Sequence, residues 1–317
     1  MLQSEWGWTV VFDLFLSGFG GCLFVLVAIC YLVLKEQFAK IAHIGAWIAF
    51  GSIAGGVLFL LADVGQPLRA VWMFGSFVNF SSWMPRGAWA LAITMVVLLL
   101  FALSFQRPIL RKAKSDDSAI PPFVAMLRKI LCVVGIALGL FVTTYTGLLL
   151  KESEYIPLWN TWYVPISFIC LSGGAGSAVA LALMCALDFE GEDWQTGKVV
   201  AGICAGCMIA AGVFVGTFVS KMSSGSVGAQ SGVHWMLSSP AFVLFAIGVI
   251  GSAIGSLASF VARTNKKMLR CIVFATCVLA IIAGISFRYC VLGGGTHEAL
   301  LSIDATQMLN GVTYLIH

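Results

Sequence analysis

The sequence predicts an all-α integral membrane protein with eight transmembrane helices, arranged as two parallel-repeat four-helix bundles with both termini on the outer side. Three observations support this prediction: 60% of the 317 residues are hydrophobic, only 10% are charged, and the mean hydropathy is +0.99. Soluble domains typically have about 25% charged residues. The composition therefore excludes a soluble domain and a disordered chain, and the net charge of +4 is too small to indicate nucleic-acid binding.

The apolar residues gather in stretches long enough to cross a hydrocarbon core, which takes about 20 residues of helix. We expect these crossings at residues 10–34, 41–63, 86–105, 124–150, 164–187, 198–220, 239–262 and 268–290. No basic residue precedes the first stretch, so the first helix does not resemble a cleaved signal peptide and we expect it to stay.

The distribution of charge predicts the orientation. Lys and Arg are more frequent in cytoplasmic loops, and alternate loops on one side hold most of the 18 Lys and Arg residues. The other side holds Arg69, Arg86, Lys151, Lys221 and Arg288. Most Trp residues also fall near that second side, where indole rings prefer the membrane interface. We therefore expect both termini to face outward.

Two glycine-rich segments indicate an internal repeat. Leu16–Gly21 reads LSGFGG and Leu171–Gly176 reads LSGGAG, and the same shift carries the second and third stretches onto the sixth and seventh. Because each half then has an even number of crossings, the repeats are expected to be parallel. We expect the first bundle to comprise residues 1–122 and 123–163, and the second residues 164–317.

The residues that bind metals are too scattered to predict a metal centre. Among the four histidines only His43 lies within a stretch, so we expect no haem. The only close pair among the ten cysteines is Cys204 and Cys207, which lacks a second pair, so we expect no iron–sulfur cluster or other metal in this chain.

Ionisable residues at membrane depth are costly and are therefore candidate site residues. Toward the outward ends of the stretches lie Asp13, Asp63, Arg69, Tyr145 and Arg288. An apolar pocket with a phenol, a carboxylate and an arginine suits a quinone, whose carbonyls need hydrogen-bond donors and whose reduction takes up protons. We expect the inward half to offer little beyond His43.

Each candidate also has a plainer interpretation that the sequence leaves open. Asp13 suits an interfacial residue, Asp63 an N-cap that pairs with Arg69, Arg288 a side chain that snorkels to the surface, and Tyr145 a belt or core aromatic. Two further functions stay open as alternatives. One is a secondary transporter with a site at the midplane, and the other is a purely structural anchor without a quinone site.

Several motifs resemble the NrfD-type membrane subunit of polysulfide reductase and its relatives. The most specific are Leu60–Arg69 (LLADVGQPLR) and Phe77–Trp89 (FVNFSSWMPRGAW). Further agreement comes from Thr143–Leu150 (TTYTGLLL), Ile156–Asn160 (IPLWN), Arg288-Tyr289 and Gly293–Gly295. The segment from Pro157 to Gly174 also resembles the anchor subunit of dimethyl sulfoxide reductase.

The resemblance implies a quinone-interacting subunit of a prokaryotic cytoplasmic (inner) membrane complex, surrounded by lipid. Such a subunit exchanges electrons between menaquinone or ubiquinone and an outward iron–sulfur subunit of the four-cluster type. That partner serves a molybdopterin catalytic subunit that holds molybdenum or tungsten. The family's quinone-contacting tyrosine corresponds to Tyr145, through Tyr-Thr-Gly, whereas Asp13 is inferred from its depth and charge. We expect Arg69, Trp83 and Arg86 to dock the partner. Because residues 199–219 carry no charge, we expect no transmembrane proton path.

Overall fold

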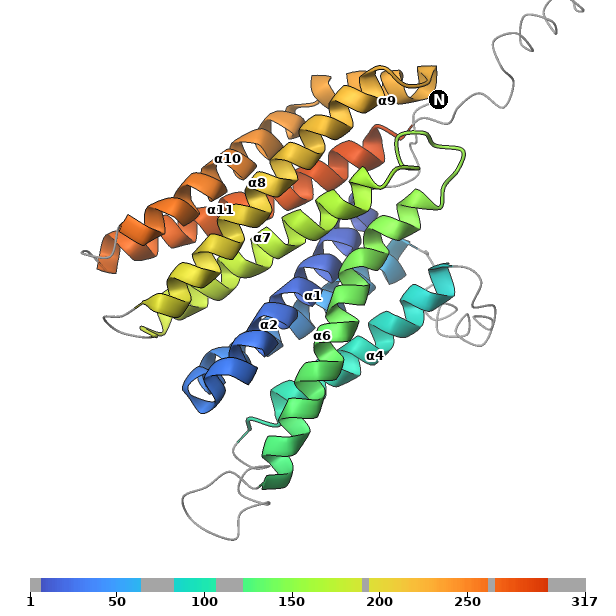
Figure 1. The fold of residues 1–317 in the computed structure, drawn as a ribbon. Helices are drawn as coiled ribbons and strands as arrows, with labels where there is room; N and C mark the ends of the chain where they lie inside the picture. The colour runs from blue at the N-terminus through green and yellow to red at the C-terminus, as the bar shows by residue number, and fades with distance from the viewer. Residues whose placement is uncertain (1–6, 64–82, 107–121, 190–193, 262–265, 296–317) are drawn as a thin grey trace, which may run out of the picture.

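The computed structural model describes residues 7–63, 83–106, 122–189, 194–261 and 266–295, and these residues form helices without any strand (Figure 1). The prediction of an all-α protein is confirmed for this part of the chain. The elements are α1 (Trp8–Leu34), the 3-10 helix η1 (Lys35–Phe38), α2 (Ala39–Asp63), α4 (Trp83–Leu103), α6 (Pro122–Lys151), α7 (Tyr163–Ala186), α8 (Gln195–Ser223), α9 (Val227–Ser238), α10 (Pro240–Val261) and α11 (Lys266–Gly293).

Seven apolar helical segments in the described residues are long enough to cross a membrane, so the chain is a multi-pass membrane protein. The first of them, Trp8–Asp63, has 56 residues and contains α1, η1 and α2. These two helices pack against each other, because the chain reverses at η1, where Lys35 has a φ of 51°. All eight apolar stretches predicted from the sequence coincide with long helices to within a few residues. The short helix α9 was not predicted.

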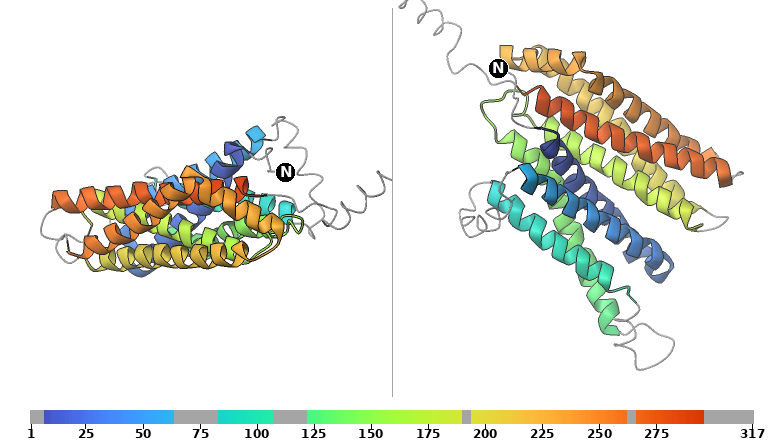
Figure 2. Two further views of the ribbon diagram at one scale, coloured as in Figure 1. Left: turned by 90° about the horizontal axis from the view of Figure 1, so that it is seen from above. Right: turned by 180° about the vertical axis from the view of Figure 1, so that it is seen from behind.

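The long helices form two groups that share a central contact (Figures 1 and 2). In the first group, α2 and α6 pack on α1, and α4 packs on α2 and α6. In the second group, α8 and α11 pack on α7, and α10 packs on α8 and α11. Helices α1 and α6 pack on α7, and α1 also contacts α11. The predicted division at residues 163 and 164 remains a prediction.

Helix α1 approaches its neighbours closely because glycines remove side chains at the crossings. A Cβ atom at Gly21 would lie 2.7 Å from the carbonyl oxygen of Gly139 on α6, and a Cβ at Gly139 would lie 2.8 Å from that of Gly21. On α7, a Cβ at Gly176 would lie 2.8 Å from the backbone nitrogen of Leu23. Small residues are what allow such close helix packing in membranes. The backbones of α1, α6 and α7 are therefore in direct contact.

The two ends of the bundle are named here by one buried charged group at each end. The Asp13 end contains the start of α1, the end of α2, the start of α4 and the ends of α6 and α11. The Arg128 end contains η1, the ends of α4 and α7, and the starts of α6, α8 and α11 (Figure 1). At the Asp13 end, the buried Trp159 joins the segment between α6 and α7 to the end of α11. Its indole nitrogen donates to the carbonyl oxygen of Val291 at 2.7 Å.

Candidate functional site

Asp13 is a carboxylate buried between α1 and α2, with 8% of its surface exposed. Ser17 lies one helical turn further along the same face of α1, and its hydroxyl donates to Oδ1 of Asp13 at 3.1 Å. Gly56 of α2 leaves the room for both side chains. A Cβ there would lie 2.7 Å from Ser17 Oγ and 3.2 Å from Asp13 Oδ1. Asp13 is therefore buried within the helix bundle and is not an exposed residue at the membrane interface.

Tyr145 lies near the end of α6 and is also 8% exposed. The tip of its ring rests directly on Gly87 of α4, and Phe141 stacks beside it with ring centroids 6.4 Å apart. Among the described residues, the Tyr145 hydroxyl makes no hydrogen bond. A phenol of this kind is available to donate to a ligand.

Asp13 lies within electrostatic range of Tyr145 and Asp63, although no hydrogen bond joins it to either of these two residues. Asp63, the last residue of α2, is exposed and accepts a hydrogen bond of 2.6 Å from the hydroxyl of Thr9. Thr9, Asp13 and Ser17 follow one another at intervals of one helical turn. The structure thus places a buried carboxylate, a buried phenol and an exposed carboxylate near one another at the Asp13 end.

Arg288 lies apart from these three residues, fully buried between α11, α7 and α1. Its Nη1 donates to the carbonyl oxygen of Gly284 at 3.0 Å and its Nη2 to the hydroxyl of Ser172 at 2.8 Å. Its guanidinium also lies over the rings of Phe168, at 4.4 Å, and Phe15, at 5.4 Å. The interpretation that Arg288 snorkels to the surface is wrong.

The charge of Arg288 is incompletely satisfied within the described part of the chain. Its Nε has no hydrogen-bond partner there, and no described carboxylate pairs with it. Neither Asp13 nor Tyr145 contacts it. The structure therefore does not bring the four predicted pocket residues together as one cluster.

The predicted docking residues are only partly described. Arg69 lies outside the described residues. The indole nitrogen of Trp83 donates to Oε1 of Glu152 at 2.8 Å, and the guanidinium of Arg86 lies 5.0 Å from the centre of the Trp83 ring. The Trp83–Glu152 bond joins the start of α4 to the segment after α6, whereas the Arg86–Trp83 contact lies within α4. A role of Trp83 and Arg86 in partner docking remains a prediction.

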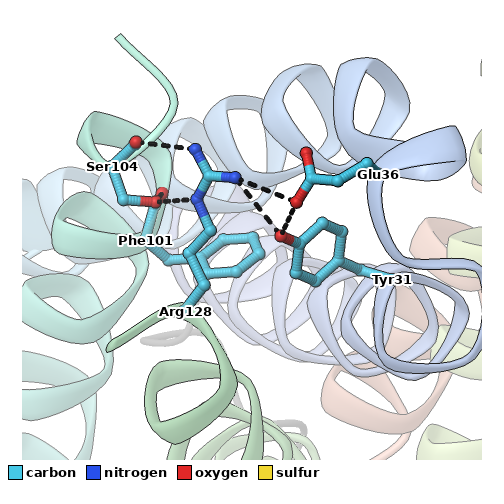
Figure 3. Close-up of polar contacts among 5 residues, drawn as sticks. All are labelled: Tyr31, Glu36, Phe101, Ser104 and Arg128. Atoms are coloured by element: carbon cyan, nitrogen blue, oxygen red, sulfur yellow. Dashed lines mark hydrogen bonds and ion pairs between the residues drawn. The ribbon is translucent and has the colours of Figure 1, made fainter. Parts of the chain in front are cut away.

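A polar network that the sequence analysis missed lies at the Arg128 end (Figure 3). Arg128 is 1% exposed and donates to the Ser104 hydroxyl at 3.2 Å, the Ser104 carbonyl at 2.9 Å and the Tyr31 hydroxyl at 3.3 Å. Its Nη1 lies 3.4 Å from Oε1 of Glu36, which also accepts from Tyr31, and its guanidinium covers the ring of Phe105 at 3.9 Å.

The expectation that this half of the protein offers little beyond His43 is therefore wrong. Arg128 is one of the basic residues on the side that holds most of the Lys and Arg, but it lies inside the predicted stretch 124–150. That position was the signal that could have identified it. His43 itself accepts a hydrogen bond from Trp47 at 2.9 Å and stacks on Phe105. Among the described residues, no three His, Cys, Asp or Glu side chains are placed to hold a metal ion.

Comparison with known proteins identifies the family. A family model described as "Polysulphide reductase, NrfD" matches residues 2–298. The chain belongs to the NrfD family. Over 197 residues it is 32% identical to one of the chains of polysulfide reductase from Wolinella succinogenes, a match that covers 59% of this chain and 60% of that protein. Over 66 residues it is 35% identical to one of the subunits of selenate reductase from Mesobacillus selenatarsenatis, covering 21% of this chain and 16% of that protein.

The Arg128 network predicts a loss of stability in this NrfD protein when the arginine is replaced. We expect Arg128→Met to lower the free energy of unfolding by about 1–3 kcal/mol, because Ser104 and Tyr31 lose a buried donor. The ion pair adds less, since Glu36 is half exposed. Thermal unfolding in detergent measures the change, with Lys129→Met at the exposed neighbouring position as control. Equal unfolding temperatures for the two variants would contradict the prediction.

For Arg288 we expect no loss of stability, in contrast to Arg128. We expect Arg288→Met to leave the unfolding temperature unchanged or to raise it, because no described carboxylate offsets the cost of burying the guanidinium and methionine fills similar space. Ser172 can then donate to a carbonyl of its own helix. The same unfolding measurement, compared with the unsubstituted protein, tests this. A fall of several degrees would mean that the charge stabilises the fold.

Proposed function

We propose that this chain is the quinone-interacting membrane subunit of a multi-subunit oxidoreductase. The observation that carries the proposal is that a carboxylate, Asp13, and a phenol, Tyr145, are both buried on two packed helices, α1 and α6, at one end of a multi-pass helical bundle. Membership of the NrfD family supports it, as do the two relatives, whose names describe parts of reductases. The chain spans 60% of the polysulfide reductase relative and 16% of the selenate reductase relative, so the activity itself, its substrate and its partners are part of the proposal.

The proposed topology has eight crossings, with both termini and the Asp13 end facing outward. A single helix of 56 residues would be about 84 Å long at 1.5 Å per residue, nearly three times the hydrocarbon thickness. Helices α1 and α2 therefore count as two crossings. More of the described basic residues lie at the Arg128 end, which favours that end as the cytoplasmic one: Lys35, Lys40, Arg128, Lys129, Lys198, Lys266, Lys267 and Arg270.

The residues at the Asp13 end have the chemistry that menaquinone or ubiquinone requires. Oxidation of a quinol supplies two electrons and two protons. The Tyr145 hydroxyl donates a hydrogen bond to a ring oxygen and orients it, while Asp13, buried in the bundle, takes up the two protons one after the other and releases each before the next. The exposed carboxylate of Asp63, which accepts a hydrogen bond from Thr9, then takes each proton on to the outer solvent. Arg288 contributes a fixed positive charge from the neighbouring helices.

The electrons pass to partners in this proposal, because no metal centre is assigned to this chain. The partner at the outer face is an iron–sulfur subunit of the four-cluster type, which serves a molybdopterin subunit that holds molybdenum or tungsten. Arg69, Trp83 and Arg86 lie on the corresponding side in the proposed topology and are the docking candidates. The complex sits in the cytoplasmic membrane of a prokaryote.

The first test is purification of the chain from its own membrane in a mild detergent, with mass spectrometry of the proteins that accompany it and extraction of bound quinone. We expect an iron–sulfur protein, a pterin-containing oxidoreductase, and menaquinone or ubiquinone. A chain that purifies alone and without quinone would contradict the proposal and favour the transporter. Partners without any quinone would favour a purely structural anchor.

Tyr145→Phe tests the site itself. The substitution removes one hydrogen-bond donor and almost no volume, so we expect quinol-linked turnover to fall about tenfold with the complex intact. Turnover driven by a reduced viologen dye, which feeds the catalytic partner directly, serves as the control and is expected to stay unchanged. Full quinol-linked turnover in the variant would exclude a role for the phenol.

A further inference from the structure

The first turn of α4 forms the wall on which the Tyr145 ring rests. A Cβ atom built on Gly87 would have Cζ, Cε2 and Cε1 of Tyr145 as its three nearest neighbours, all well inside van der Waals contact. These atoms form the end of the ring that carries the hydroxyl. We propose that Gly87 is a positioning residue for Tyr145, which fixes where the phenol hydroxyl meets its ligand. The inference rests on the proposed role of Tyr145 in quinone binding.

The contact leaves no space for a side chain at position 87. Tyr145 is almost completely buried and Phe141 flanks its ring, so a methyl group on Gly87 displaces the ring tip rather than finding free space. The contacts of Gly21 and Gly139 differ from that of Gly87, because a Cβ at either position would meet the backbone of the opposite helix. Those two glycines set the distance between helices, whereas Gly87 sets the position of one polar side chain.

A second contact joins α4 and α6 further toward the start of α4. Trp83, the first residue of α4, donates its indole N–H to Glu152 at 2.8 Å. Glu152 directly follows α6, and its backbone nitrogen donates to the carbonyl oxygen of Leu148 at 3.2 Å, so the acceptor continues the helix that carries Tyr145. The Trp83–Glu152 bond thus clamps the wall to α6 two helical turns beyond the phenol.

A displaced hydroxyl loses its function before the fold is lost. Hydrogen bonds weaken steeply when the donor distance or angle departs from its optimum. A misplacement of about 1 Å in a site can cost up to about a hundredfold in rate. We therefore expect Gly87→Ala to mimic the loss of the hydroxyl while leaving the complex assembled.

A double-mutant cycle separates positioning from simple packing. The intact complex carries Gly87→Ala, Tyr145→Phe or both, and quinol-linked kcat and KM are measured beside viologen-linked turnover. Phenylalanine keeps the ring, so the steric conflict with Ala at 87 is present in both backgrounds and only the hydroxyl differs. Gly51→Ala on α2 is the matched control, because a Cβ there meets no atom within 4 Å.

We expect each single substitution to lower quinol-linked turnover about tenfold, and the double variant to fall no further than Tyr145→Phe alone. Viologen-linked turnover and the Gly51→Ala control are expected to stay unchanged. Independent losses that multiply in the double variant, or full turnover in Gly87→Ala, would overturn the inference. Full turnover in Tyr145→Phe would overturn the proposed function together with it.

Two further measurements keep the test decisive. If Gly87→Ala does not assemble, Glu152→Ala enters the cycle instead, with Glu154→Ala at a nearby exposed position as control. We expect a loss of several-fold that is absent in the Tyr145→Phe background, and an unchanged rate would overturn the inference. The double-mutant cycle is repeated without partners by measuring the affinity of the purified chain for a water-soluble naphthoquinone. Quenching of Trp fluorescence reports the binding. Equal affinities in the unsubstituted chain and Gly87→Ala would likewise overturn it.

Discussion

The rest of the structure depends on the close passage of α1 between α6 and α7. The Gly21–Gly139 crossing and the contact of Gly176 with the backbone of Leu23 bring three helices together without intervening side chains. In lipid the hydrophobic effect does not drive helices together, so such van der Waals contact supplies much of the association. The same crossings fix the rotation of α1, and thereby turn Asp13 toward α2 and into electrostatic reach of Tyr145 on α6. The geometry of the candidate site follows from backbone packing in the middle of the bundle.

The two buried arginines, Arg128 and Arg288, have very different surroundings. Arg128 donates to Glu36 on η1, to Tyr31 on α1 and to Ser104 directly after α4, and thereby joins these elements at the Arg128 end. Arg288 is more deeply buried, yet its Nε has no partner among the described residues and its main neighbours are the aromatic rings of Phe15 and Phe168. Burying a charge without an ion-pair partner is costly. Stability of the fold therefore does not explain why position 288 carries a guanidinium.

The positions of the long helices could be predicted from the sequence, whereas the contacts between side chains of different helices could not. The eight apolar stretches were evident because hydrocarbon thickness dictates their length, whereas the short helix α9 has no such constraint. Tyr145 was found through a motif, and Asp13 because a carboxylate inside an apolar stretch is costly. Depth along a helix does not reveal which helix lies beside it, so the separation of Arg288 from Asp13 and the contact of Gly87 with Tyr145 could not be predicted. Arg128 was missed because it was judged by its charge and not by its position within a stretch.

Polarity along the bundle also bears on the direction of proton exchange. Between Ser17 and Tyr31, α1 buries the apolar side chains of Leu23, Phe24 and Val27. Hydroxyl groups at intermediate depth, such as those of Thr143, Ser177, Ser256 and Thr276, donate to carbonyl oxygens of their own helices. These hydroxyl groups already donate to backbone carbonyl oxygens, so they do not form the midplane site that a transporter needs. On α1, buried apolar side chains separate Asp13 from the Arg128 end, whereas Asp63 lies within electrostatic range of Asp13. The proposed function accordingly has protons and quinone exchange at the same end of the bundle, the Asp13 end.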